Sequence, residues 1–387
     1  MVMVVVATEV GRMQVEARTI ASIADEWDEL ADRVRSTPFT RPGWISAWWD
    51  AFGQGSLKVL SSREGNRLTG VMPIVREGSF IHSPTNLETP LYGFVTEGDA
   101  SARCLTATLV SSGARHLRLS TVDREDVGLR SLEQGLRASG FRAITQPNLV
   151  SPFLTTTGAW TAYKETVDAK VRSEMRRRRR RLEGIGALSF DVVDGSERLD
   201  AVLEDGFRVE GSGWKGEYGT AINSDRRTRR FYRNVARWAA ERGWLRLAFL
   251  RLDGRSIAFD LCLEADGVHY LVKTGFDHDF GRFGPGVILR SQMLQRAFEG
   301  PVETYEFLGT VDGANNDWKL TWADRSHQRM QIDAFAPSIL GSAEWLMLRY
   351  GVPSARRARA LAVAALGPSG RDLAKRWRAR ARRRLVP

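Results

Sequence analysis

The chain has 387 residues, 43% of them hydrophobic, which is enough apolar content for a folded core and more length than one average domain. Its formal net charge of +11 comes from 57 lysines and arginines against 46 acids, and residues 354–387 hold 11 of those basic residues and one acid, Asp372. The rest of the chain, with 46 basic and 45 acidic residues, is nearly neutral, so a basic-surface argument for nucleic-acid binding applies to the tail and not to the body.

The first half of the chain alternates predicted helices and strands. Met1–Ala7 is apolar but short, and no basic segment precedes it, so we expect no signal peptide. Pro42 opens a helix on which Trp44, Trp48 and Phe52 recur every four residues, and we interpret this stripe as core packing rather than as a pocket wall. Helices are predicted at 23–34, from 42 onward, at 100–110 and at 125–138, with strands at 14–20, 57–62, 68–75, 116–121 and 141–146 and a loop-rich segment at 80–95. This alternation predicts α/β or α+β layers.

A long helix is predicted over residues 162–183, and it carries six consecutive arginines, Arg176–Arg181. A basic run on a helix usually marks a solvated face. Six arginines in a row cover every face, so some of these side chains must lie against protein or an anion. We interpret the segment as the helix that links two halves, with nucleic-acid contact as the secondary interpretation.

The second half begins with a predicted meander of three strands that leads into a glycine loop. The Asp253-Gly254 and Asp266-Gly267 pairs suit tight turns between apolar runs. The loop Gly281–Gly286 then precedes a helix predicted over 287–298, and Pro285 suits a first helical position. Because such a loop exposes backbone N–H groups at the positive end of a helix dipole, we predict a cradle for an anionic or carbonyl-bearing group.

Residues 57–74 and 245–261 share one pattern. Each segment reads as a strand, a turn that contains glycine and a second strand, and each follows a helix that ends in aromatic residues. This internal likeness predicts a tandem duplication.

Four polar and aromatic clusters stand in a specific order in the second half. They are Glu210–Gly216, Phe231-Tyr232, the approach Lys273–Asp277 with its glycine loop, and Tyr305–Gly309 followed by Asp317–Trp322. In this order the clusters resemble the acetyltransferase family associated with cellulose biosynthesis (CelD-like), a tandem branch of the GNAT superfamily related to the Fem aminoacyltransferases. The matching positions are Glu210, Trp214-Lys215-Gly216, Phe231-Tyr232, Pro285-Gly286, Phe307-Leu308-Gly309, Lys319 and Trp322.

The resemblance implies a fold and a domain organisation. The fold is α/β, in α+β layers, with two tandem GNAT-like domains whose sheets are mixed and mainly antiparallel. Residues 1–160 would form the first domain and residues 161–335 the catalytic domain, which includes the arginine-rich helix. Residues 336–387 would form a basic helical tail.

The resemblance also implies an activity, which is transfer of an acyl group from acetyl-CoA or another acyl-CoA to an amine or hydroxyl. The acceptor would be a cell-envelope, glycan or small-molecule compound. The superfamily's pyrophosphate loop is Arg/Gln-x-x-Gly-x-Gly/Ala, but here Gly281 stands three residues before Gly284, and Arg282 is one position late. This departure keeps open an aminoacyl-tRNA donor, as in the Fem relatives, and a non-catalytic GNAT-like binding module.

Site roles follow from the resemblance and from the needs of acyl transfer, which are a base for the nucleophile and donors for the oxyanion. Glu210 and Asp277 are the candidate bases, and Lys319 is a point cation for developing negative charge. The predicted donor-binding residues are Lys273, Gly275, Arg282, Gly284 and Gly286, and the predicted acceptor-binding residues are Trp214, Lys215, Tyr232, Phe307, Gly309 and Trp322. The structural alternatives are a surface role for the two lysines, Lys215 and Lys319, and a helix-end charge for Glu210. Because these positions follow residue 200, we predict that the second half carries the active site and that the first half shapes the acceptor cleft.

Other chemistries have little support in the sequence. The five histidines are scattered, no Cys/His cluster suits zinc, and no nucleophile elbow or Walker loop is present, so we predict no metal. Cys104 and Cys262 lie inside apolar runs, which is typical of buried thiols in a reducing compartment. No apolar stretch is long enough to span a bilayer. These features predict a cytoplasmic protein.

The tail has an amphipathic pattern. Leu373, Trp377, Ala381 and Leu385 recur every four residues among dense arginines. This pattern is typical of a helix that lies in an anionic membrane interface, so we predict peripheral attachment at the inner face of the membrane. An RNA-binding tail and a disordered solubilising end are the competing hypotheses, and nucleic acid would bind only through the arginine-rich segments.

Overall fold

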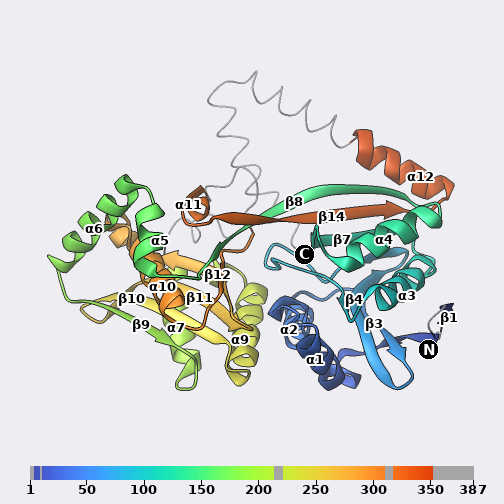
Figure 1. Ribbon diagram of the computed structural model, residues 1–387, viewed down its shortest axis with the longest axis horizontal. Coiled ribbons are helices and arrows are strands. Elements are labelled where there is room, and N and C mark those ends of the chain that lie inside the picture. Colours follow the sequence, from blue (N-terminus) through green and yellow to red (C-terminus); the bar gives the residue numbers. More distant parts are fainter. Residues whose placement is uncertain (1–3, 9–10, 213–220, 310–316, 352–387) are drawn as a thin grey trace.

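The computed structural model describes residues 4–8, 11–212, 221–309 and 317–351, and within them one mixed sheet runs through the whole molecule (Figure 1). The strands of the first half are β1 (Val4–Thr8), β2 (Gly11–Arg18), β3 (Ser56–Glu64), β4 (Arg67–Glu77), β5 (Phe80–His82), β6 (Val95–Thr96), β7 (His116–Asp123) and β8 (Arg142–Thr155). Those of the second half are β9 (Leu188–Val193), β10 (Leu245–Leu252), β11 (Arg255–Ala265), β12 (Val268–Phe276), β13 (Thr304–Glu306) and β14 (Arg325–Phe335). Their order is β1-β2-β3-β4-β5-β7-β14-β8-β13-β12-β11-β10-β9, and β6 pairs with β4 off this path.

Helices cover both faces of the sheet. Those of the first half are α1 (Ala24–Arg33), α2 (Pro42–Phe52), α3 (Asp99–Val110) and α4 (Val127–Ala138). Those that follow are α5 (Trp160–Thr166), α6 (Ala169–Glu183), α7 (Leu199–Gly211), α9 (Arg226–Glu241), α10 (Pro285–Glu299), α11 (Asp317–Leu320) and α12 (Ile339–Leu346). Short helical turns are η1 (Ile20–Ser22), η2 (Pro38–Thr40), η3 (Ile222–Ser224), η4 (His278–Phe283) and η5 (Met347–Gly351). The predicted α/β fold class is confirmed.

The two halves repeat one strand plan, as the sequence likeness predicted. The hairpin β3–β4 corresponds to β10–β11, and both hairpins shift register near the turn, after Ser62 and after Leu250. Next in the sheet, β5 pairs in parallel with β7, and β12 pairs in parallel with β13. A helix joins the parallel strands in each case, α3 in the first half and α10 in the second.

The last strand of each half lies in the other half's part of the sheet. Strand β14, from the end of the second half, pairs antiparallel with β7 of the first half. Strand β8, from the end of the first half, pairs antiparallel with β13 of the second. The two exchanged strands also pair with each other over most of their length, and Figure 1 shows them crossing the molecule as one long ribbon pair. The predicted division at residue 160 falls just after β8, and as a domain boundary it stays a prediction.

One hydrophobic core is shared by the halves. Helices α1 and α2 and helices α7 and α9 contribute to the same buried cluster. Trp44 is fully buried and lies edge-on to Phe231, with 5.1 Å between ring centroids. Gly43 approaches α9 so closely that an added Cβ would lie 2.1 Å from Trp238, so only glycine allows this contact. The core interpretation of the tryptophan stripe on α2 is confirmed.

The long arginine-rich helix is not continuous, which corrects the prediction of a single helix over 162–183. It is divided into α5 and α6, with Val167 in an extended conformation between them. The side chain of Asp168 accepts hydrogen bonds from the backbone N–H groups of Lys170 at 2.7 Å and Val171 at 3.3 Å. Asp168 therefore begins a new helix, as an N-cap residue does.

Smaller differences have similar causes. The fourth helix begins at Val127 rather than at Glu125, because Asp126 caps it through the N–H groups of the first turn. The segment predicted as loop-rich contains β5, whose three residues pair in parallel with β7. None of the described helices has the length and the apolar composition needed to cross a bilayer.

Candidate functional site

The parallel strands β12 and β13 separate after three residue pairs. The last residue pair of the two strands is Tyr270 with Glu306, yet β12 continues to Phe276. After β13 the backbone turns away from β12 at Leu308, which has a left-handed φ of 56°. The β12 ladder with β11 also shifts register here, because Leu261 pairs with Lys273 and Cys262 with Leu271. The result is a split in the centre of the second half's sheet, beside a bulged strand. A bulge re-aims backbone groups, and N–H groups at such an edge can stabilise an oxyanion.

The loop predicted as a cradle stands on one face of this split, at the start of α10. Gly284 has a φ of 57°, which glycine adopts without strain, and Pro285 occupies the first turn of the helix. A Cβ added to Gly286 would meet only Phe276, at an ordinary 3.7 Å. The Gly284 N–H donates to the Gly281 carbonyl at 3.0 Å and the Val287 N–H to the Gly284 carbonyl at 3.1 Å, so the loop offers the positive end of the helix and the open space beside Gly286.

The arginine-rich helix α6 packs against η4 and α10, beside this loop. The Arg178 guanidinium occupies the space that a Cβ of Gly284 would take, with its Nη1 2.0 Å from that position. Arg181 lies over the Phe283 ring at 5.3 Å, and Arg282 lies over the same ring at 4.8 Å. Arg178 and Arg181 of the arginine run therefore lie against the protein at the predicted cradle, as expected from the sequence.

Glu210, which the sequence predicts as a base, lies against the opposite face of β12. Glu210, at the end of α7, is only 1% exposed, and its Oε2 accepts the backbone N–H of Ile222 at 2.9 Å. Gly275 explains this position, because a Cβ there would lie 2.5 Å from the Cα of Glu210. Glycine in β12 therefore lets the end of α7 approach the strand.

A polar cluster next to Glu210 joins the two halves of the molecule. Glu88, from the loop between β5 and β6, accepts a hydrogen bond from the Tyr232 hydroxyl at 2.6 Å and pairs with the Lys273 Nζ at 2.7 Å. The Lys273 ammonium also lies 5.2 Å from the centre of the Tyr232 ring. Burial, reinforced by Glu88 and Glu210, raises the pKa of Tyr232 well above its usual value, so its hydroxyl keeps its proton.

The predicted donor-binding residues are divided between the two faces. Thr274 points toward α10, since its hydroxyl is 3.5 Å from the Arg290 guanidinium. Its neighbours Lys273 and Gly275 contact the α7 and α9 side instead. The structure therefore groups Arg282, Gly284 and Gly286 on the α10 face and places Lys273 and Gly275 with Glu210 and Tyr232.

Asp277 and Lys319, two other predicted catalytic residues, have structural partners. Asp277 is 3% exposed, and its Oδ2 is 2.6 Å from the Arg255 guanidinium. Lys319 donates to the backbone carbonyls of Leu308 at 3.2 Å and Gly309 at 3.3 Å, and so holds the chain where it leaves the split. These contacts account for both side chains, and their part in catalysis stays a prediction.

The predicted acceptor-binding residues other than Tyr232 have mixed positions. Phe307 and Trp322 are buried in the core on the α10 side. A Cβ on Gly309 would lie 2.9 Å from Leu149, so this glycine makes a close backbone contact. Trp214 and Lys215 lie outside the described residues.

A fully buried ion pair lies under α10, and the sequence analysis did not predict it. The Arg290 guanidinium contacts both Asp260 oxygens, at 3.0 Å and 2.9 Å, and also bonds the Tyr305 hydroxyl. Burial lowers the pKa of Arg290, but the charge of Asp260 raises it by more, so the pKa is above its usual value. The pair ties α10 to β11 and β13 beneath the split. No pattern in the sequence marks it, because arginine and aspartate at such spacing are common on surfaces.

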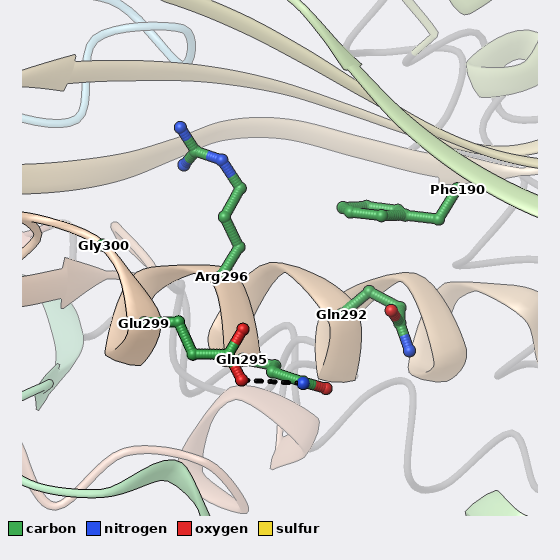
Figure 2. A pocket seen from close by; sticks show the side chains of 6 residues that line it. All are labelled: Phe190, Gln292, Gln295, Arg296, Glu299 and Gly300. Atoms are coloured by element: carbon green, nitrogen blue, oxygen red, sulfur yellow. Dashed lines mark hydrogen bonds between the residues drawn. The ribbon is translucent and has the colours of Figure 1, made fainter.

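A hollow of about 290 Å³ lies at the other end of α10, between Phe190 and the last turn of the helix (Figure 2). Polar side chains of α10 and the Phe190 ring form its wall, and Gln295 donates to Glu299 at 2.8 Å along the helix surface. Because it is remote from the glycine loop, we do not assign it to the site. Among the described residues, no group of three or more His, Cys, Asp or Glu is arranged to hold a metal ion.

Comparisons with known proteins concern the fold. Residues 169–320 match the family model described as an acetyltransferase (GNAT) domain. The crystal structure of FemX superposes with a TM-score of 0.59 at 13% identity, covering 82% of this chain and 96% of that one. No curated protein sequence matches the chain.

Two further solved structures are similar. A C-terminal domain (DUF2156) assigned to a lysylphosphatidylglycerol synthetase of Agrobacterium fabrum gives a TM-score of 0.54 at 13% identity, covering 85% of this chain and 97% of that one. A protein of unknown function from Bacteroides thetaiotaomicron gives 0.52 at 11% identity, covering 83% and 99%. Identities this low show a shared fold. The match to the acetyltransferase (GNAT) domain model thus lies in the second half of the chain, and the shared fold extends over most of the chain.

Proposed function

We propose that the chain is an acyltransferase that moves an acyl group from acyl-CoA to an amine or hydroxyl of a cell-envelope, glycan or small-molecule acceptor. The observation that carries this proposal is the split between β12 and β13, with a helix N-terminus and arginines on one face and a buried carboxylate–tyrosine–lysine cluster on the other. A thioester placed across the split would meet an anion site on one side and an acceptor site on the other. The order of the clusters in the sequence further supports a CelD-like acetyltransferase.

The donor would bind on the α10 face. The backbone at Gly286 and the positive end of α10 suit the phosphates of CoA. The loop lacks the superfamily's usual arginine or glutamine three positions before Gly284, and Arg178 of α6 stands at that glycine instead. Guanidinium groups bind phosphate strongly, so α6 would supply the missing cation.

The acceptor would bind on the α7 and α9 face, which includes Glu88 of the first half. The acceptor's nitrogen or oxygen would attack the thioester carbonyl carbon. The carbon–sulfur bond would break, and the CoA sulfur would leave as a thiolate that takes a proton from solvent, while Glu210 returns the nucleophile's proton to solvent. Glu210 is the proposed acceptor of the nucleophile's proton, and a backbone N–H of the bulged β12 would stabilise the oxyanion. Tyr232 and Lys273, held by Glu88, would orient the acceptor.

Calorimetric titration of the full chain with acetyl-CoA and with CoA tests the donor site. We expect binding by the native chain, and loss of binding by at least about tenfold in Gly286→Val, because the backbone must approach the ligand closely. A Cβ at this position meets no close protein atom, so the variant should fold. Gly98→Val is the matched control, since a Cβ there meets nothing within 4 Å. Equal donor affinity in a folded Gly286→Val chain would exclude this loop as the donor site.

An aminoacyl-tRNA donor is the second candidate, because the loop departs from the usual pyrophosphate motif and α6 is rich in arginine. Release of free CoA thiol with a panel of amine acceptors supports the first candidate. Transfer from charged tRNA without any response to acetyl-CoA supports the second. A folded chain that binds neither acetyl-CoA nor CoA and transfers nothing from either donor is a GNAT-like binding module that keeps the fold and has lost the donor.

A further inference from the structure

The helix that follows the last strand carries an exposed apolar face. Five large apolar side chains of α12 and η5 are exposed: Ile339 at 90%, Leu340 at 63%, Leu346 at 49%, Met347 at 69% and Tyr350 at 58%. Ile339 and Leu346 stand seven residues apart, as do Leu340 and Met347, so each pair lies on the same side of the helix after about two turns. Soluble surfaces rarely gather this many large apolar groups without a partner.

The other side of α12 is held by the protein. Gly341 is buried against Ala336, with no room for a side chain. Arg142 of β8 lies over the Trp345 ring at 5.2 Å, and Arg115 pairs with Glu344 at 2.9 Å. Figure 1 places α12 at one corner of the molecule, past the end of β14. The apolar face is therefore fixed in position and directed away from the body.

The charge around this face is positive. Glu344 is the one acid among residues 336–351, and Arg115 neutralises it. Arg349 is exposed on the same segment, and Arg142 lines an open hollow of about 710 Å³ beside Ile339 and Leu346. The sequence then continues into residues 354–387, with 11 basic residues and one acid. Those residues lie outside the part of the chain that the structure describes, and only their charge enters the argument. A protein partner would match the apolar groups, and the surplus of positive charge favours an anionic bilayer, which matches both.

We propose that the α12–η5 face docks on the surface of an anionic phospholipid bilayer, with its apolar side chains at the level of the acyl chains and Arg142 and Arg349 at the level of the headgroups. Apolar side chains and basic residues bind such a surface together. Each basic residue near it adds to the attraction, and the apolar groups set the depth and the orientation. This inference does not depend on the reaction that the chain catalyses.

Sedimentation of the full chain with vesicles tests the proposal. The vesicles are pure phosphatidylcholine, or three parts phosphatidylcholine to one part phosphatidylglycerol. We expect binding to the anionic vesicles only, and a loss of about tenfold or more in L340S/M347S, because two large apolar side chains no longer leave water. Ile185→Ser is the matched control, since Ile185 is 52% exposed on another part of the surface and its loss should change nothing.

The tail contributes separately in this experiment. R382Q/R383Q/R384Q should weaken binding to anionic vesicles by about a hundredfold at low salt, from three surface charges. If L340S/M347S binds anionic vesicles as tightly as the native chain, the face does not enter the membrane and the proposal is wrong. Equal binding to neutral vesicles would also overturn it. So would self-association without lipid that L340S/M347S abolishes, because a second copy would then cover the face.

Discussion

Glu88 is the residue whose replacement tests most directly whether the first half completes the site. Its carboxylate is the shared partner of the Tyr232 hydroxyl and the Lys273 ammonium, at 2.6 Å and 2.7 Å. The Glu88 and Lys273 side chains are each 17% exposed, so solvent screens their interaction only in part. Glu88→Gln keeps the shape of the side chain and one acceptor oxygen but removes the charge that both donors face.

The expected magnitude follows from these contacts. A hydrogen bond to a charged group contributes about 1.5–3 kcal/mol, so we expect Glu88→Gln to lower the free energy of unfolding by about 2 kcal/mol. Lys273→Met should cost a similar amount. Because both substitutions break the same ion pair, the double variant should cost about 1 kcal/mol less than the sum of the two.

Urea unfolding of the four proteins measures this coupling, and kinetics measure its consequence for the reaction. A positioning role predicts a fall in kcat of about tenfold with unchanged donor affinity, since the donor is proposed to bind on the other face of β12. Glu97→Gln is the control, because Glu97 of the same half pairs with Arg33 and Arg67 away from the site. If the loss of stability in the double variant equals the sum of the two single losses within about 0.5 kcal/mol, Glu88 and Lys273 do not act as a unit and the prediction is wrong.

Two further predictions concern buried charges of the second half. Arg290→Met should destabilise the chain by about 3–5 kcal/mol in urea unfolding, because it leaves Asp260 buried without its cation, and a second substitution, Asp260→Leu, should recover part of that loss. Burial raises the pKa of Glu264, but hydrogen bonds and charges from His269 and Arg296 outweigh it and bring the pKa to about 2, against an ordinary value of 4.5. The stability that Glu264 contributes is therefore complete above about pH 4.5 and is lost as the pH falls through about 2. In Glu264→Gln the free energy of unfolding should fall less steeply over that pH range. Equal pH profiles of the two proteins would contradict this prediction.

Local features of the fold were predictable because short stretches of sequence determine them. The Asp253-Gly254 and Asp266-Gly267 pairs mark turns of the second meander, and both aspartates have the positive φ that such turns need. Gly284 and Pro285 mark the start of α10. Asp168 was the exception. The break between α5 and α6 arises because the Asp168 side chain caps a new helix inside a stretch whose residues otherwise have a helical pattern. Helix periodicity alone does not reveal such a break.

Features that depend on distant pairing were not predictable from one sequence. The partner of β14 is β7, about two hundred residues earlier, and no local pattern encodes that choice. Glu88 stands in a segment without any motif, and its role depends on Tyr232 and Lys273, which only the folded halves bring near. The sequence pattern predicts donor binding for Lys273, because strand alternation does not reveal which face of the sheet holds the helix with the glycine loop.

The exchange of β8 and β14 has a consequence for how the protein is made. During synthesis the first half emerges with β7 complete, but the strand that completes its sheet next to β7 is residues 325–335, which the ribosome produces last among the described strands. Until then the edge of β7 presents unpaired backbone groups and invites wrong partners. Two halves that resemble each other are the type of neighbours that mispair in this interval. The nascent chain should therefore need protection until β14 arrives, and its last folding step should be slow, because it closes a connection of about two hundred residues.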